Sequence, residues 1–254
     1  MIQISTRAAA RCARAAAVGV VAIASQSHAA DFKVFYPNVT GGEFEFENRA
    51  FDTLDKEPSR TNGRNYTNEL GYGVTDWWFT EIENEFKKDP QDKWRYTALA
   101  SENIFQILPQ GSSFVDLGFF AEYEIAMRRG DSDNFNFGPI IQKQFGRWLT
   151  TANIFVSADI GGAEPDSPHF NYGLEVKYLL TPLFSPGFQA FGDPGPFTHF
   201  NRFSEQDHRA GPVIFGTWNL FPGKINYEAG YLLGLTHDSP SGTMKFLLEY
   251  EISL

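Results

Sequence analysis

Hydrophobic and polar residues alternate along most of the chain, and the last twelve residues, T-M-K-F-L-L-E-Y-E-I-S-L (243–254), show this most clearly. The even-numbered positions from Met244 to Leu254 are apolar, and the odd-numbered ones are polar except for Leu247. Because successive side chains of a strand point to opposite faces, this segment has one apolar and one charged face. A soluble sheet accommodates this pattern, and so does a transmembrane β-barrel whose apolar face meets lipid.

The same alternation predicts twelve strands, which turn signals such as Thr75-Asp76, Gly192-Asp193-Pro194-Gly195 and Pro222-Gly223 separate. The predicted strands cover residues 42–53, 64–74, 77–88, 94–107, 113–128, 134–145, 148–161, 169–180, 185–191, 208–220, 224–237 and 243–254. Connections after the even-numbered strands are short, and those after the first and ninth strands are long. An even strand number with this asymmetry is typical of outer-membrane barrels with both termini in the periplasm. We therefore predict an all-β fold, in which residues 30–254 form one transmembrane antiparallel up-and-down β-barrel of about twelve strands.

Two local features add detail to this prediction. The adjacent polar residues Glu102 and Asn103 interrupt the alternation and predict a β-bulge. The five tryptophans all lie beside predicted strand ends, where a membrane protein meets the bilayer interface; they are Trp77, Trp78, Trp94, Trp148 and Trp218. In the alternative fold, a soluble β-sandwich, these side chains would belong to the core.

The N-terminal residues predict export. Arg7, Arg11 and Arg14 precede the short apolar run 15–24, and Ser27-His28-Ala29 follows as a small-x-small cleavage signature. We predict a secretory signal peptide over residues 1–29 that is cleaved, with a retained membrane anchor as the alternative. Cys12, the single cysteine, would leave with it, so the mature chain would have no thiol chemistry and no disulfide.

Charge narrows the possible partners. Residues 1–29 contain three basic and no acidic residues, so the mature chain carries 18 Lys and Arg against 31 Asp and Glu. This balance argues against nucleic-acid binding, which needs basic patches. No apolar run of about eighteen residues follows the signal, which argues against a helical membrane protein.

Charged side chains fall on one face of several predicted strands. A charge that faces lipid at the bilayer midplane costs about 2–4 kcal/mol, so these side chains are predicted to line the lumen. The predicted lumen-lining residues are Glu43, Glu45, Glu47, Glu69, Glu81, Glu83, Glu85, Glu122, Glu124, Lys177, Glu228, Lys245, Glu249 and Glu251.

This acidic wall has two interpretations. In the first, the lumen attracts cations or a cationic solute, and the protein is a passive pore or small-solute transporter. In the second, basic residues neutralise the carboxylates inside a nearly filled barrel, which would then have a structural or adhesive role without transport. The candidate neutralising residues are Arg49, Lys87, Arg95, Lys177 and Lys245.

Residues 69–86, E-L-G-Y-G-V-T-D-W-W-F-T-E-I-E-N-E-F, combine a Tyr-Gly pair, a Thr-Asp turn and alternating acids. This hairpin resembles that of the "MetA pathway of phenol degradation" family of outer-membrane proteins. The resemblance implies a barrel that passes small aromatic or hydrophobic compounds, without catalytic residues or cofactors. The C-terminus, with Ile252 and Leu254, resembles the signal read by the barrel-assembly machinery, although it ends in Leu rather than Phe. Outer-membrane lipid and that machinery are therefore the expected partners, in the outer membrane of a diderm bacterium.

Histidines in the predicted external loops raise two further chemistries. His237-Asp238-Ser239 resembles the His-x-Ser arrangement of outer-membrane lipid A deacylases, which makes a lipid hydrolase a second alternative function. The histidines with Asp166 and Asp207 match no standard metal-site spacing. We therefore predict no enzyme activity, no catalytic residue and no metal site.

The predicted external loop 192–207 contains Phe197, Phe200 and Phe203 at three-residue spacing. This spacing suits one short helical turn with an aromatic stripe. We predict that these rings fold inward as an apolar gate, because hydrophobic constrictions gate by dewetting. In the alternative, the loop packs on the rim and protects strand ends.

Overall fold

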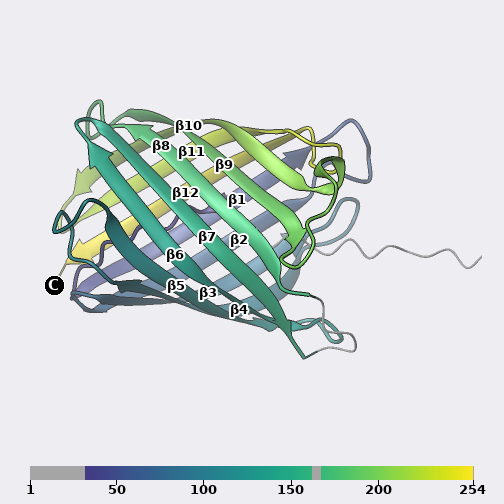
Figure 1. Cartoon of the computed structure of the whole chain (residues 1–254), viewed down its shortest axis with the longest axis horizontal. Helices are drawn as coiled ribbons and strands as arrows, with labels where there is room; N and C mark the ends of the chain where they lie inside the picture. Colours follow the sequence, from purple (N-terminus) through teal and green to yellow (C-terminus); the bar gives the residue numbers. More distant parts are fainter. Residues whose placement is uncertain (1–31, 162–166, 254) are drawn as a thin grey trace, which may run out of the picture.

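Twelve antiparallel strands form a closed barrel (Figure 1), which confirms the predicted fold class. The structure is a computed structural model that describes residues 32–161 and 167–253, so the predicted signal peptide and Leu254 lie outside the described residues. The strands are β1 (Glu43–Leu54), β2 (Arg64–Thr75), β3 (Trp78–Lys88), β4 (Arg95–Gln106), β5 (Asp116–Ala126), β6 (Asp133–Phe145), β7 (Trp148–Ile160), β8 (His169–Tyr178), β9 (Ser185–Pro196), β10 (Asp207–Leu220), β11 (Gly223–Gly234) and β12 (Gly242–Ser253). The described residues include no helix long and apolar enough to cross a membrane.

Each strand pairs with its sequence neighbours, and β1 also pairs with β12 to close the barrel. This closing pair runs from Glu43 opposite Ser253 to Leu54 opposite Gly242. Its register places Glu47 between Glu69 of β2 and Glu249 of β12. Residues far apart in the sequence thus form one acidic wall on the lumen side of β12, β1, β2 and β3.

Strand ends agree with the sequence prediction to within three residues, except at the end of β9. The run Gly192-Asp193-Pro194-Gly195, predicted as a turn, instead continues β9 to Pro196. There the pairing with β8 resumes beyond a register shift, and the Asp193 carboxylate accepts a hydrogen bond from the Gly195 amide at 2.7 Å. The predicted loop is therefore shorter and covers residues 197–206.

The predicted bulge at Glu102 and Asn103 is wrong. Both residues pair in regular register, opposite Glu81 and Thr80 of β3. The irregularity lies nearer the start of β4, because Glu85 pairs with Ala98 while the next residue of β3 pairs with Tyr96. Thr97 is the extra residue, and it restores the alternation that places Glu102 in the lumen.

The two ends of the barrel differ. We call the end with the two-residue turns 76–77, 146–147 and 221–222 the turn end, and the opposite end, with loops such as 55–63, 197–206 and 235–241, the loop end. Two turn-end connections, 107–115 and 179–184, are longer than predicted. Both termini were expected at one end, but only Ser253 lies at the turn end; the first described residue, Phe32, packs inside the lumen near the loop end against Phe51 and Phe191.

Side chains separate by face as the alternation predicts. Phe46, Ile82 and Leu220 point outward and are 51–56% exposed, whereas the lumen-facing Glu47 and Glu69 are each 2% exposed. The outer surface is therefore apolar and the interior polar. This is the reverse of a soluble barrel, whose core would be apolar.

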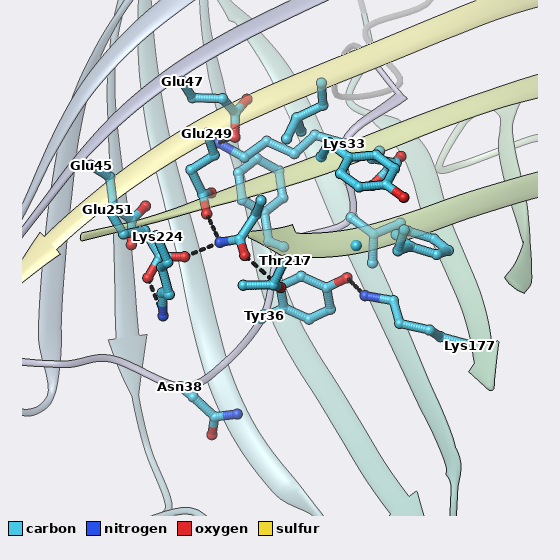
Figure 2. A pocket seen from close by; sticks show the side chains of 18 of the residues that line it. Lys33, Tyr36, Asn38, Glu45, Glu47, Lys177, Thr217, Lys224, Glu249 and Glu251 are labelled. Atoms are coloured by element: carbon cyan, nitrogen blue, oxygen red, sulfur yellow. Dashed lines mark hydrogen bonds and ion pairs between the residues drawn. The ribbon is translucent and has the colours of Figure 1, made fainter. Parts of the chain in front are cut away.

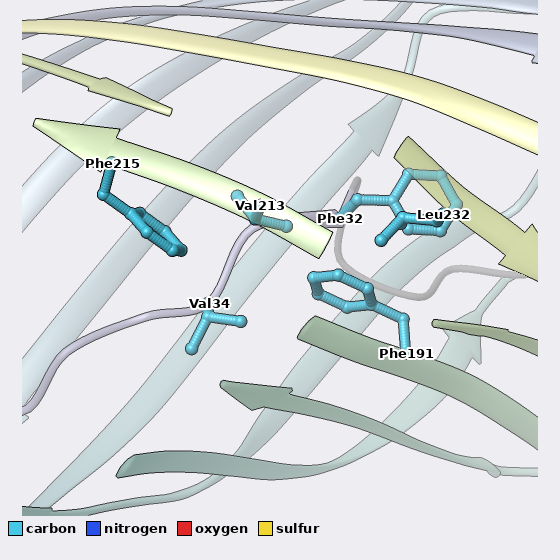
Figure 3. Close-up of a cluster of buried hydrophobic side chains, with 6 residues drawn as sticks. All are labelled: Phe32, Val34, Phe191, Val213, Phe215 and Leu232. Atoms are coloured by element: carbon cyan, nitrogen blue, oxygen red, sulfur yellow. The ribbon is translucent and has the colours of Figure 1, made fainter. Parts of the chain in front are cut away.

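Two apolar clusters nevertheless lie inside, and residues 32–39 contribute to both. One, shown in Figure 3, contains Phe32, Val34, Phe191, Val213, Phe215 and Leu232. The other contains Phe35, Phe79, Ile104, Phe120, Ile140 and Phe155, with Val39 packed against it. The chain ahead of β1 thus supplies the apolar centre of a barrel whose wall is polar inside.

Candidate functional site

The chain ahead of the first strand, residues 32–42, threads the lumen from near the loop end to the turn end. We call it the lumen segment. Lys245 on β12 donates a hydrogen bond to the carbonyl of Phe32, near the loop end. At the other extreme, the Gly42 amide donates to the Gly73 carbonyl at 2.8 Å. Eleven extended residues reach at most about 36–40 Å, enough to cross the barrel once.

Side chains of the wall satisfy the backbone of the lumen segment, which joins no strand ladder. The Phe35 amide donates to Asn153 Oδ1 at 2.7 Å, and Asn153 Nδ2 donates back to the Phe35 carbonyl at 3.0 Å. The Val39 amide donates to Gln106 Oε1 at 2.9 Å. Because buried peptide groups need partners, these amides allow an irregular segment to lie inside the barrel.

Two wall glycines provide the space that the segment fills. A Cβ at Gly73 would lie 1.9 Å from the Thr40 carbonyl oxygen, and one at Gly118 would lie 2.9 Å from Pro37 Cβ. Neither distance is compatible with a side chain unless the segment moves. The lumen face of the wall is thus shaped to the segment.

Lys33 reaches from the segment into the acidic wall. Its Nζ lies 2.5 Å from Glu69 Oε2, 3.0 Å from Glu81 Oε1, 3.4 Å from Glu47 Oε2 and 3.9 Å from Glu102 Oε2. We call these four side chains, one each from β1 to β4, the carboxylate cage. Figure 2 shows Lys33 and Glu47 at one side of the lumen cavity.

Arg49 lies next to the cage. Its guanidinium is 2.8 Å from Glu47, 2.6 Å from Glu69 and 3.0 Å from Glu83, and the side chain is 3% exposed. Lys87 pairs with Glu85 at 2.7 Å in the same wall. Cations therefore neutralise part of the acidic wall, as the second interpretation expected.

A smaller charged network involves side chains of β8, β9, β11 and β12. Lys177 Nζ donates to the hydroxyl of Tyr36 at 2.7 Å, and that hydroxyl donates to Glu175 Oε1 at 2.8 Å. Lys245 pairs with Glu228 and lies 2.7 Å from Gln189 Oε1. The lumen segment thus bridges both sides of the lumen through Lys33 and Tyr36.

A cavity of about 670 Å³ remains between the lumen segment and strands β1 and β10–β12, in the half of the lumen nearest the turn end. Seven Glu side chains and three Lys side chains line it. Glu45, Glu249 and Glu251 lie on its acidic side (Figure 2), and Glu43 also lines the cavity. Lys224 pairs with Glu251, and Asn226 donates to Glu249 at 2.6 Å, so the cavity keeps an excess of negative charge.

The predicted lumen residues all lie on the inner face of the wall. Glu122 and Glu124 border a separate space of about 30 Å³ beside Arg49 and Glu102. Four of the five predicted neutralising residues pair with lumen carboxylates. The exception is Arg95, which pairs with Asp92 at 2.6 Å outside the lumen because it lies at the loop-end start of β4.

Sequence reasoning missed Lys33, Tyr36 and Glu102. The signal that points to the first two is the aromatic-rich run D-F-K-V-F-Y (31–36), which directly follows the predicted cleavage site and precedes Pro37. Glu102 was assigned to a bulge, and its partner on the lumen segment, Lys33, is not close to it in the sequence.

Two groups of carboxylates bring oxygens within 4.8 Å of one another, as a metal ion requires: Glu43 with Glu45 and Glu251, and Glu69 with Glu83 and Glu102. In the second group, Lys33 and Arg49 already supply positive charge. The first group borders the open cavity, where no further feature identifies a metal.

His237 and Ser239 do not form a catalytic pair, because their side chains contact other residues. Ser239 is 3% exposed, and its hydroxyl donates to Asp207 Oδ1 at 2.7 Å and accepts from the His208 amide at 2.9 Å. The His237 ring is solvent-exposed and contacts Asp238 at 3.1 Å. Ser239 thus ties two loop-end segments together, and its described partners do not include a histidine ring that would activate it.

The three loop phenylalanines are 56–66% exposed. The Phe200 ring lies 5.8 Å from Phe170, and the Phe203 ring stacks at 5.5 Å on His208. Only Phe203 lies in a short helical turn, Phe203–Glu205. Phe170 and His208 alternate with lumen-facing residues, so these contacts favour the rim alternative, and gating by Phe197, Phe200 and Phe203 stays a prediction.

No protein-family model and no curated protein matches the chain. A solved structure, the outer membrane channel DcaP of Acinetobacter baumannii, is similar with a TM-score of 0.34 and 9% sequence identity, covering 83% of this chain and 96% of that chain. A similarity at this level gives no information on what this chain does. The resemblance to the MetA-pathway family therefore stays a prediction.

Proposed function

We propose that this chain spans an outer membrane and forms a passage for small cationic solutes, which the lumen segment narrows. The acidic cavity of about 670 Å³ inside a wall with an apolar outer surface is the observation that carries the proposal. Strands of ten to fourteen residues are long enough, since a tilted membrane strand needs about 9–11 residues. Carboxylates around a cavity with low-dielectric walls concentrate cations.

The second candidate function is a structural barrel without transport. The ion pairs of Lys33 and Arg49 and the apolar clusters around Phe32 and Phe35 favour it, because they fill much of the lumen. The MetA-pathway resemblance would favour aromatic or hydrophobic solutes instead. We prefer cations because the cavity lining has more carboxylates than any other charged group.

Single-channel recording in planar bilayers tests the proposal. A salt gradient across the bilayer should give a reversal potential of the sign expected for cation preference. The double change Glu43→Gln and Glu45→Gln should move this potential toward zero, because it removes two cavity charges. As a control, Glu57→Gln with Glu205→Gln removes the same charge from loops at the loop end and should leave the potential nearly unchanged.

The variant that lacks residues 33–39 separates the two candidates. If the lumen segment narrows a passage, this variant should conduct more than the wild type. If neither protein conducts although both are folded, the passage does not exist and the structural role holds.

A further inference from the structure

The carboxylate cage and the neighbouring Glu83 contain more acidic side chains than there are described cations in contact with them. Glu83 and the four cage residues give five buried carboxylates, whereas Lys33 and Arg49 give two cations. A buried carboxylate without a cation is costly, so it either takes up a proton or attracts positive charge.

Two cage oxygens have no hydrogen-bond partner among the described residues: Glu69 Oε1, which lies 2.6 Å from the Arg49 guanidinium, and Glu102 Oε2. Glu102 is 3% exposed, and its Oε2 has no hydrogen-bond partner among the described residues, although Lys33 Nζ lies 3.9 Å away. Lys33 donates hydrogen bonds to Glu69 and Glu81. The cage therefore holds one ammonium group, that of Lys33. Glu102 Oε2 is a further acceptor close to that ammonium group.

The ammonium group in the cage comes from the lumen segment, which lies inside the barrel and is not one of its strands. The cage residues lie on four neighbouring strands, but Lys33 lies on the lumen segment, which is held by wall side chains and, at Gly42, by a backbone hydrogen bond. Lys33, Glu47 and Glu81 also line the 670 Å³ cavity, together with the apolar Phe79 and Ile104. A small molecule in that cavity can thus reach the cage.

We propose that the carboxylate cage binds the primary ammonium group of an alkylammonium solute, and that Lys33 occupies the cage when the solute is absent. This inference rests on the proposed function and names its solute class. Primary ammonium is favoured over a quaternary one because the cage carboxylates accept N–H hydrogen bonds. The apolar neighbours Phe79 and Ile104 suit an unbranched alkyl chain. The solute and Lys33 compete for the same site. Binding of the solute therefore breaks the ion pairs between Lys33 and the cage, which hold this part of the lumen segment in place.

The proposal is tested by removing the Lys33 side chain and adding a free alkylammonium ion that can take its place in the cage. Lys33→Ala in the full-length protein removes the three outer methylene groups and the ammonium group of the side chain. Adding n-butylammonium chloride should raise the thermal unfolding midpoint of this variant in a saturable way, because the probe binds the folded state. Tetramethylammonium chloride at the same concentration has the same charge without N–H donors and should give a much smaller shift. Lys224→Ala, which removes a cavity lysine outside the cage, should show no difference between the two salts.

Two results would overturn the ammonium site. Equal shifts with both salts would show an effect of ionic strength alone, and no shift with either would show that the cage does not bind. If Lys33→Ala does not fold without additive, folding it in each salt gives the same decision: rescue by butylammonium alone supports the site, and failure in both overturns it.

Measuring conductance as well as binding separates failure of the ammonium site from failure of the proposed passage. Saturable binding to a Lys33→Ala barrel that never conducts would retain the ammonium site but remove the passage. A conducting barrel with no preference for butylammonium would retain the passage but remove the site.

Discussion

Single charged residues differ widely in how much their ion pairs stabilise this barrel, and Arg49 is expected to contribute most. It contacts three buried carboxylates on β1, β2 and β3, and only 3% of its side chain is exposed. Arg64, on the outer face of β2, pairs with Asp52 at 2.9 Å, but 45% of its side chain is exposed. Solvent screens the second pair and not the first.

Arg49→Gln should therefore destabilise the barrel by about 3–5 kcal/mol, because it leaves buried carboxylates without their cation. Arg64→Gln, the same chemical change on the outer face, should cost at most about 1 kcal/mol. Urea titration of the two variants in lipid vesicles measures both free energies of unfolding. Equal, small losses would mean that water reaches the Arg49 network and screens it.

The sequence predicted the lumen-facing acids at this scale but not their arrangement. Alternation alone assigns Glu47, Glu69 and Glu81 to one face, because facing depends only on the local strand. The partner that joins them, Lys33, is 36 residues from Glu69 and 48 from Glu81. Such a contact depends on barrel closure, which no local pattern contains.

At the scale of elements, hydrogen bonds link loop 55–63 to loop 235–241 beside the closing pair β1 and β12. Asp55, in loop 55–63, accepts hydrogen bonds from the amides of Glu57 and Ser241 at 2.9 Å each. Arg60 of the same loop donates to the His237 carbonyl at 2.7 Å. Asp55 therefore links loop 55–63 to loop 235–241 where the barrel closes.

The backbone hydrogen bonds from Glu57 and Ser241 hold the pKa of Asp55 below its usual 3.8. A lowered pKa in the folded state means that the link is complete above pH 3.8 and is lost as the pH falls through the folded value. Asp55→Asn should therefore increase protease cleavage within residues 235–241 at neutral pH. Asp92→Asn, in loop 89–94, should leave that cleavage unchanged, and equal cleavage in all three proteins would contradict the link.

Elements with a regular alternation could be predicted from the sequence, and irregular ones could not. The end of β9 was missed because Gly192-Asp193-Pro194-Gly195 has the composition of a turn, although tertiary pairing with β8 keeps it extended. The lumen segment was missed because its partners are wall side chains such as Asn153, which is 118 residues from Phe35. Neither feature has a period that a sequence pattern can show.

The whole molecule is asymmetric along its axis. The three two-residue turns all lie at one end, beside the longer connections 107–115 and 179–184, and the other end has loops only; the apolar outer surface lies between the two ends. Outer-membrane barrels place short turns in the periplasm and longer loops outside. We therefore expect the turn end to face the periplasm.

Cysteines introduced singly at residues 76, 198 and 222 test this orientation, because the mature chain is expected to lack other thiols. A membrane-impermeant maleimide should label residue 198 on intact cells, and should label residues 76 and 222 only after the outer membrane is permeabilised. Labelling of 76 or 222 on intact cells, with none at 198, would reverse the orientation.

Twelve strands bring the chain back to the side from which β1 started, so the wall alone predicts that both its ends face one compartment. The lumen segment adds a thirteenth pass and makes the number of crossings odd. Phe32 and Ser253 therefore lie toward opposite mouths of the barrel. A reporter joined ahead of Phe32 and one joined after Ser253 would sample different sides of the membrane, and loss of that difference would show that the segment has left the lumen.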